Sequence, residues 1–120
     1  MRDIEKLMEK ITDYWNGEIG NLLQILKEDG WEVEITDVGI GWVELEIHKN
    51  TEKLKLKLRE ELQYLCNDNY IRYYVLEVYS MESGKPLYTI EIGKLTEEEI
   101  QEECIEEEEE YFEEEYFEED

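Results

Sequence analysis

The side chains that could carry acid–base or nucleophilic chemistry are few and stand far apart in the sequence. His48 is the only histidine, and the alternating pattern around it places it on the polar side of a predicted strand. A histidine acts as a general base only beside a positioned nucleophile or carboxylate. Ser80 and Ser83 are the only serines, and neither lies in a Gly-x-Ser-x-Gly sequence. These residues predict that the protein is not an enzyme.

The two cysteines, Cys66 and Cys104, have neither Cys-x-x-Cys nor Cys/His metal spacing. Cys66 also lacks the basic surroundings that would make it a reactive thiolate. The pair could form a disulfide, but the cysteine usage is more typical of two buried or free thiols in a cytosolic protein. A defined calcium site needs a loop of mixed oxygen ligands, which the glutamate runs do not supply. We expect neither a metal nor a cofactor.

The acidic residues are concentrated at the C-terminal end. The chain holds 35 acidic and 12 basic residues, a formal net charge of −23. Residues 96–120 contain 16 of the acidic residues and no basic one, while residues 1–95 have a net charge of only −7. Such a field repels nucleic acid and anionic lipid and attracts basic protein surfaces. With no signal peptide and no apolar run of membrane-spanning length, the sequence predicts a cytoplasmic protein that binds neither nucleic acid directly nor membranes.

The C-terminal glutamates are interrupted by aromatic residues at near-regular intervals. Residues i and i+4 of a helix lie about 6 Å apart along its axis, comparable with successive phosphates of a nucleic-acid strand. Rows of carboxylates could therefore imitate a nucleic-acid backbone and occupy the basic groove of a nucleic-acid-binding protein. Aromatic residues between them would supply apolar anchors. The predicted partner-binding residues are Glu106, Glu107, Glu108, Glu109, Glu110, Tyr111, Phe112, Glu113, Glu114, Glu115, Tyr116 and Phe117.

In size, charge and its acidic end rich in Glu and Tyr, the chain resembles the phage DNA-mimic inhibitors of restriction enzymes and some anti-CRISPR proteins. The resemblance is compositional and covers mainly residues 96–120. It implies a non-enzymatic inhibitor of viral or plasmid origin that blocks its target by occlusion in the host cytoplasm. The absence of alanine, typical of AT-rich genomes, is consistent with that origin.

The order of the predicted elements also resembles that of type III secretion chaperones, which are small dimers that hold unfolded segments of effector proteins. This resemblance implies an alternative function, a small acidic chaperone-like protein-binding module, and a homodimer. In that fold the strand Lys53–Leu58 and a short helix at Arg59–Cys66 would form the middle of the domain.

An amphipathic helix is predicted at the start of the chain. Apolar residues recur at steps of three and four from Ile4 to Leu26. Asp3 is placed to cap the start of this helix and Gly30 to cap its end. The dipeptide Asn16-Gly17 weakens the middle, so that one kinked helix and two short helices both fit the sequence.

Five later segments carry the alternation, or the β-branched and aromatic content, of strands. The second is separated from the first by a glycine-containing turn, Asp37–Gly41. After the third segment the apolar spacing changes to that of a helix, which predicts a short middle helix at Arg59–Cys66, ended by Asn67–Asn69. The five segments are Trp31–Thr36, Val43–His48, Thr51–Leu58, Tyr70–Met81 and Leu87–Ile92.

Two features of these strands each allow two interpretations. Lys53, Lys55 and Lys57 form the one basic row of the sequence, which is either a solvated strand face or a partner for the acidic segment. Trp31 and Trp42 either pack in the core or form an exposed contact patch.

The acidic segment has a strong helix start. Thr96 and Glu99 can form a capping box, and Ile100 and Cys104 begin an apolar stripe that continues to Tyr111. The sequence thus predicts an α+β core domain over residues 1–94 and an acidic, aromatic-containing helical segment over residues 95–120. The core is an antiparallel sheet of four to five strands with an N-terminal amphipathic helix and a short middle helix, and the chain ends in an acidic C-terminal helix.

Overall fold

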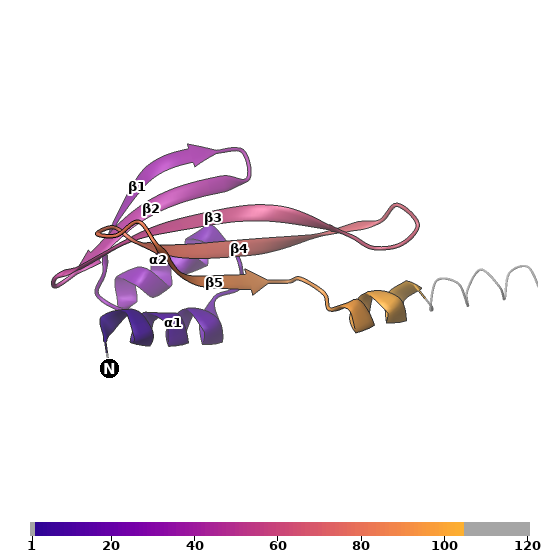
Figure 1. Ribbon diagram of the computed structural model, residues 1–120, viewed down its shortest axis with the longest axis horizontal. Helices are drawn as coiled ribbons and strands as arrows, with labels where there is room; N and C mark the ends of the chain where they lie inside the picture. Colours follow the sequence, from indigo (N-terminus) through magenta and orange to yellow (C-terminus); the bar gives the residue numbers. More distant parts are fainter. Residues whose placement is uncertain (1, 105–120) are drawn as a thin grey trace, which may run out of the picture.

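The computed structural model describes residues 2–104, which form a five-stranded antiparallel sheet with two helices packed against one face (Figure 1). Each strand pairs with its neighbour in the chain, in the order β1-β2-β3-β4-β5. The α+β class, the antiparallel sheet, and the N-terminal and C-terminal helices are confirmed, and the structure has a short second helix. The elements are α1 (Asp3–Tyr14), α2 (Ile19–Glu28), β1 (Glu32–Gly39), β2 (Trp42–Lys49), β3 (Glu52–Tyr64), β4 (Tyr70–Ser80), β5 (Pro86–Ile92) and a C-terminal helix at residues 97–104.

The N-terminal amphipathic segment forms two short helices rather than one kinked helix. Its backbone becomes extended at Trp15, and Gly17 adopts a φ of +99°, which side-chain-bearing residues rarely adopt. A Cβ at Gly17 would also lie 2.5 Å from the Tyr74 ring, so the chain can pass this close to β4 only with glycine. The break lets α1 and α2 fold back on each other over the sheet (Figure 1).

The two ends of this helical pair differ from each other in how they are capped. Asp3 does not cap α1 as expected: the N-cap residue is Arg2, and the Asp3 carboxylate instead accepts a hydrogen bond from Asn50 Nδ2 at 3.0 Å. Gly30 does end α2 as expected, with a φ of +87°. The Gly30 N–H donates to the Lys27 carbonyl and the Trp31 N–H to the Leu26 carbonyl, the two bonds of a Schellman motif.

The core lies between the helices and one face of the sheet. On that face Val43, Leu45 and Ile47 of β2 pair with Leu58, Leu56 and Leu54 of β3, and all six are buried. The row continues through Leu76 and Val78 of β4, which are fully buried. The opposite face carries the intervening charged residues. The period of two seen in the sequence therefore sets which side of each strand is buried.

The predicted middle helix at Arg59–Cys66 is wrong, because β3 continues as a strand to Tyr64. Leu58 and Leu62 are four residues apart, a spacing that fits one face of a strand as well as one face of a helix. Pairing of this segment with Tyr70–Tyr74 of β4 selects the strand. The helix required by the resemblance to type III secretion chaperones is therefore absent from this part of the chain.

The β3–β4 hairpin closes with a tight turn at Asn67–Asn69, where the sequence had predicted the end of a helix. Asn67 and Asp68 both have positive φ values, of 56° and 59°, and the Asn69 N–H donates to the Cys66 carbonyl at 3.1 Å. Turns of this handedness match the right-handed twist of paired strands. The hairpin is thus a long two-stranded ribbon that extends beyond the helices (Figure 1).

Candidate protein-binding surfaces

The C-terminal helix begins with the capping box expected from the sequence. The Glu99 N–H donates to Thr96 Oγ1 at 3.2 Å, and the Thr96 N–H donates to Glu99 Oε1 at 3.2 Å. Glutamates in the first turn also complement the positive end of the helix. Residues 97–104 contain five acidic side chains and no basic one: Glu97, Glu98, Glu99, Glu102 and Glu103.

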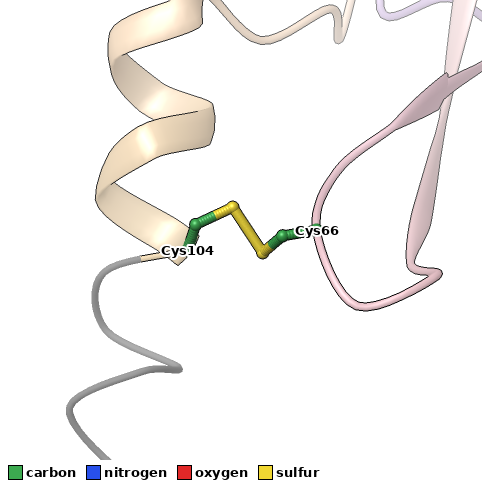
Figure 2. The surroundings of a disulfide bond; sticks show 2 residues. All are labelled: Cys66 and Cys104. Atoms are coloured by element: carbon green, nitrogen blue, oxygen red, sulfur yellow. A yellow bond between two sulfur atoms is a disulfide. The ribbon is translucent and has the colours of Figure 1, made fainter.

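This acidic helix and the residue before Thr96 are both joined to the β3–β4 hairpin. The Gln63 side chain binds the main chain of Leu95 twice, donating to its carbonyl at 2.9 Å and accepting from its N–H at 2.8 Å. Beyond the helix start, Cys104 forms a disulfide with Cys66, with a Cα–Cα distance of 5.9 Å. Figure 2 shows the bond crossing from Cys104 of the helix to Cys66 of the hairpin loop. The helix that carries the carboxylates of residues 97–104 is therefore bonded to the hairpin of the sheet.

The expectation of two free thiols is wrong. β3 and β5 run in the same direction, because both are antiparallel to β4. The chain that leaves β5 is thus heading towards the same end of the sheet as the β3–β4 turn (Figure 1). That topology brings Cys104 to Cys66 across a sequence separation of 38 residues.

The predicted partner-binding residues, from Glu106 to Phe117, lie outside the described residues, and so does Tyr111 of the predicted apolar stripe. The stripe can be followed at its first two positions only. Ile100 and Cys104, one turn apart, are the half-buried residues of a helix whose other side chains are exposed.

The lysine row of β3 is paired across the outer face of the sheet. Lys55 and Lys57 both approach the carboxylate of Glu44 on β2, at 3.5 and 3.7 Å. Lys57 Nζ also lies 5.2 Å from the centre of the Tyr79 ring on β4. The two lysines thus share one carboxylate of the neighbouring strand, an opposite-charge contact of the kind that stabilises cross-strand pairs.

A charged network continues this pattern between β3 and β4. Arg59 forms ion pairs with Glu77 and with Glu61, and the Tyr79 hydroxyl donates to Glu77 at 2.6 Å. The hydrogen bond from Tyr79, followed by that from Arg59, outweighs burial and holds the pKa of Glu77 below its ordinary value. The same contact with Glu77 raises the pKa of Tyr79. Both charges of the Arg59–Glu77 pair are thus stabilised at neutral pH.

An open cavity of about 640 Å³ lies between the start of α2 and the β1–β2 hairpin. Of the described residues that line it, Glu18, Arg59 and Glu60 are charged, and the cavity volume is in the usual range of ligand sites, roughly 300–1,000 Å³. Glycine at position 39 makes room for the Trp42 indole, which a Cβ there would overlap. The apolar wall is formed by Ile19, Leu23, Ile35, Val38, Trp42 and Tyr74.

The two tryptophans in question have different environments. Trp31 is buried in the core, at 3% exposure, and its indole N–H donates to Asp29 Oδ2 at 3.0 Å. Trp42 is 41% exposed beside the cavity. The core interpretation is thus confirmed for Trp31, while Trp42 belongs to a partly open apolar surface.

The far end of the β3–β4 ribbon presents a second apolar surface. Leu62, Tyr64 and Tyr70 are all more than half exposed, on the face that α1 and α2 cover elsewhere in the sheet. The Tyr64 and Tyr70 rings meet edge to face, with their centres 5.4 Å apart. Exposed aromatic clusters of this kind are common at protein contacts. This surface was not predicted from the sequence, because the segment Arg59–Cys66 was expected to be a helix and not a strand with alternating faces.

The side chains considered for catalysis, His48, Ser80 and Ser83, contact a strand carboxylate or the main chain of a turn. His48 Nε2 lies 2.9 Å from Glu32 Oε2 on the exposed sheet face. Ser80 and Ser83 accept hydrogen bonds from main-chain N–H groups of the β4–β5 turn. Within residues 2–104, no group of three or more His, Cys, Asp or Glu side chains is placed to hold a metal ion. No helix in that same range has the length and apolar content needed to cross a membrane.

The chain was compared with protein-family models, with curated proteins and with solved structures. None of the three comparisons finds a match.

Proposed function

We propose that the protein is a non-enzymatic acidic inhibitor that imitates nucleic acid and occupies the basic groove of a nucleic-acid-binding protein. The observation that supports this proposal best is the attachment of the acidic helix. Five carboxylates on residues 97–104 are held to the hairpin by the Gln63–Leu95 hydrogen bonds and the Cys66–Cys104 disulfide. A fixed anionic surface binds a rigid basic groove at a lower entropic cost than a flexible tail does.

The spacing of these carboxylates suits the proposed role. Glu98 and Glu102 are four residues apart on one side of the helix, as are Glu99 and Glu103, and each pair is separated by about 6 Å along the axis. Their field would steer a basic partner and release the anions bound to its groove. The segment from Glu106 to Phe117 would extend the same surface and add aromatic anchors.

The inhibitor would be encoded by a virus or plasmid and would act in the cytoplasm of the host cell. Its target would be a host nuclease, a restriction enzyme or a CRISPR complex. Disulfides are rare in most cytosols, although the intracellular proteins of hyperthermophiles are a known exception.

The proposal can be tested by affinity capture followed by a salt titration. The immobilised full chain is expected to retain nucleic-acid-binding proteins that duplex DNA displaces, with log K falling linearly as log salt rises. Four Glu→Gln changes in the C-terminal helix should weaken binding about 10-fold and reduce the salt slope, taking roughly 0.3–0.5 kcal/mol for each charge. The capping residue Glu99 is left in place, and the changes are Glu97→Gln, Glu98→Gln, Glu102→Gln and Glu103→Gln.

A matched control removes the same charge from exposed glutamates elsewhere in the molecule. The control should keep the salt slope and the affinity within about twofold, since surface charges far from a contact act only weakly across a Debye length. Binding that ignores both DNA and salt, or that falls equally in the two variants, would contradict nucleic-acid mimicry. The control changes are Glu5→Gln, Glu9→Gln, Glu34→Gln and Glu82→Gln.

A second candidate function, a chaperone-like module that holds an apolar protein segment, is favoured by the open cavity beside Trp42. An extended apolar peptide entering this cavity should change Trp42 fluorescence. Val38→Asp, which places a charge on the exposed cavity wall, should abolish that change, whereas the four Glu→Gln changes in the C-terminal helix should not. Loss of peptide binding in both variants would argue against the cavity as the site.

A further inference from the structure

We propose that the free edge of β1 is a docking site for an extended segment of a partner protein in which Lys or Arg alternates with Leu, Ile or Val. The segment pairs with β1 as an additional strand of the sheet. This site is separate from nucleic-acid mimicry, which concerns the C-terminal helix. It rests on the second candidate function, a module that holds an apolar protein segment, and it names the class of segment that the module takes.

β1 is an edge strand of the sheet. It pairs with β2 along one side, and no strand within residues 2–104 pairs with its other side (Figure 1). Seven of its eight residues are exposed. An exposed edge presents unpaired main-chain N–H and C=O groups, to which an extended peptide can bind as a further strand. The main chain of β1 can therefore accept a partner strand on the side away from β2.

The two faces of β1 differ in chemical character. One face is apolar and stands opposite buried residues of β2, yet Ile35 is 53% exposed and Val38 is 66% exposed. The other face is acidic. Thr36 is the extra residue of a β-bulge, and the apolar and acidic residues keep to their own faces on both sides of it. The apolar set is Val33, Ile35 and Val38, and the acidic set is Glu32, Glu34 and Asp37.

The sheet already contains a strand that complements this alternation. β2 alternates acidic and apolar residues as β1 does, and its other side is paired with β3, in which lysine alternates with leucine. On the outer face, Lys55 and Lys57 approach the carboxylate of Glu44 at 3.5 and 3.7 Å. On the inner face, Leu45 stands opposite Leu56, and both are fully buried. A segment of the β3 type makes the same two kinds of contact with β1.

The cavity beside α2 receives the apolar side chains of the segment. Ile35 and Val38 line this cavity of about 640 Å³ together with Ile19 and Leu23 of α2. Neighbouring strands lie about 4.8 Å apart, so that apolar side chains on the inner face of an added strand lie beside Ile35 and Val38. Binding thus removes apolar surface of both partners from water.

Charge selects against a second copy of this chain at the same edge. Pairing β1 with another β1 brings two acidic faces together, and like charges opposite each other destabilise a strand pair. The whole chain also has a formal net charge of −23, which opposes self-association. Lys or Arg at alternate positions of the partner replaces this repulsion with attraction. The edge is therefore suited to a basic partner strand.

Amide hydrogen exchange of the full chain, followed by NMR, tests the site with a synthetic peptide. The probe is the acetylated and amidated peptide Lys-Leu-Lys-Leu-Lys-Leu-Arg, which has the sequence of residues 53–59. At saturation it should slow the exchange of the free-edge amides of β1 about 10-fold or more, because these N–H groups then donate to the peptide. The control peptide Lys-Lys-Lys-Leu-Leu-Leu-Arg has the same charge without the alternation, and it should leave the exchange of β1 unchanged.

Two protein variants separate the site from a general attraction to acidic surfaces. Glu34→Gln combined with Asp37→Asn should weaken binding of the alternating peptide about 5-fold, from the loss of two cross-strand charge contacts. The matched control removes two exposed charges from α1, Glu5→Gln with Glu9→Gln, and should keep the affinity within about twofold. Equal weakening in the two variants would contradict the assignment to β1.

The neutral peptide Gln-Leu-Gln-Leu-Gln-Leu-Gln distinguishes this proposal from the second candidate function. If it changes Trp42 fluorescence while neither alternating peptide slows the exchange of β1, the holding of an apolar segment stands and strand addition is wrong. If no peptide gives either signal, both are wrong. Equal affinity for the neutral and basic peptides would contradict the selection by charge, and equal slowing by the control peptide would overturn the role of the alternation.

Discussion

The buried carboxylate of Asp29 connects both helices to the start of the sheet. Asp29 is 8% exposed. Its carboxylate accepts hydrogen bonds from Lys10 of α1 at 2.5 Å and from the Trp31 indole at 3.0 Å, and its main-chain carbonyl accepts one from Lys49 of β2 at 2.6 Å. We expect Asp29→Ala to lower the free energy of unfolding by about 3 kcal/mol. Most of this comes from leaving the Trp31 N–H buried without its acceptor, about 1–3 kcal/mol.

The Lys10 contact adds less, because the lysine side chain is 48% exposed and solvent screens the pair. We take its contribution as about 0.5–1 kcal/mol. Asp29→Asn is the matched control, since it keeps an acceptor for Trp31 and removes only the charge. It should cost about 1 kcal/mol. Urea denaturation followed by tryptophan fluorescence measures both variants, and their slopes with denaturant should be unchanged.

The pH dependence follows from the pKa of Asp29. Burial disfavours its ionised form, but the hydrogen bonds from Lys10 and Trp31 outweigh burial and hold the pKa below its ordinary value. The stabilisation is therefore complete above the unfolded-state pKa, about 3.9, and is lost as the pH falls through the lower folded-state pKa. The difference between wild type and Asp29→Asn should be constant from about pH 7 to about pH 5 and should shrink below about pH 4. Equal losses in Asp29→Ala and Asp29→Asn, or a loss below about 1 kcal/mol in Asp29→Ala, would refute the assigned role of the indole hydrogen bond.

Three further changes test the local geometry. Gly17→Ala should cost about 2 kcal/mol or more by thermal unfolding, from the positive φ and the clash with Tyr74; a loss below about 0.5 kcal/mol would argue against that strain. Gly20→Ala is a matched change, because nothing lies within 4 Å of the new Cβ, and it should instead stabilise α2 by about 0.5–1 kcal/mol. Destabilisation by Gly20→Ala would show that the space around this position is not open. Glu77→Gln should cost about 1 kcal/mol at neutral pH and, because Glu77 raises the pKa of Tyr79, should return that pKa towards its ordinary value in an NMR titration of the ring. The Glu77 effect should disappear at low pH, as the carboxylate of the wild type is protonated below its lowered pKa.

Local signals in the sequence predicted the ends of the elements well. Gly30 ends α2 and Thr96 with Glu99 starts the C-terminal helix, because each feature depends on residues within about one turn of each other. The strand alternation likewise identified the buried face of β2 and most of β3. Asp3 shows the limit of such signals. It is a suitable capping residue, but the helix starts one residue earlier than expected, so that Asp3 lies within the first turn and Arg2 is the N-cap.

Features that depend on distant residues were not predictable in this way. The segment Arg59–Tyr64 has a spacing that suits helix and strand alike, and only pairing with β4 selects the strand. The disulfide between Cys66 and Cys104 requires knowledge that β3 and β5 point to the same end of the sheet. The cavity beside Trp42 arises where α2 meets the β1–β2 hairpin, two elements brought together only by the folded chain.

The strictly sequential order of the sheet has a consequence for how the chain folds. Every strand pairs with the strand next to it in sequence, so each pairing closes a short loop and little chain entropy is lost before contacts form. During synthesis, α1 and α2 emerge first and the hairpins can add to them one after another. Because Cys66 belongs to the β3–β4 turn and Cys104 follows β5 in the chain, we expect the disulfide to close on strands that are already paired.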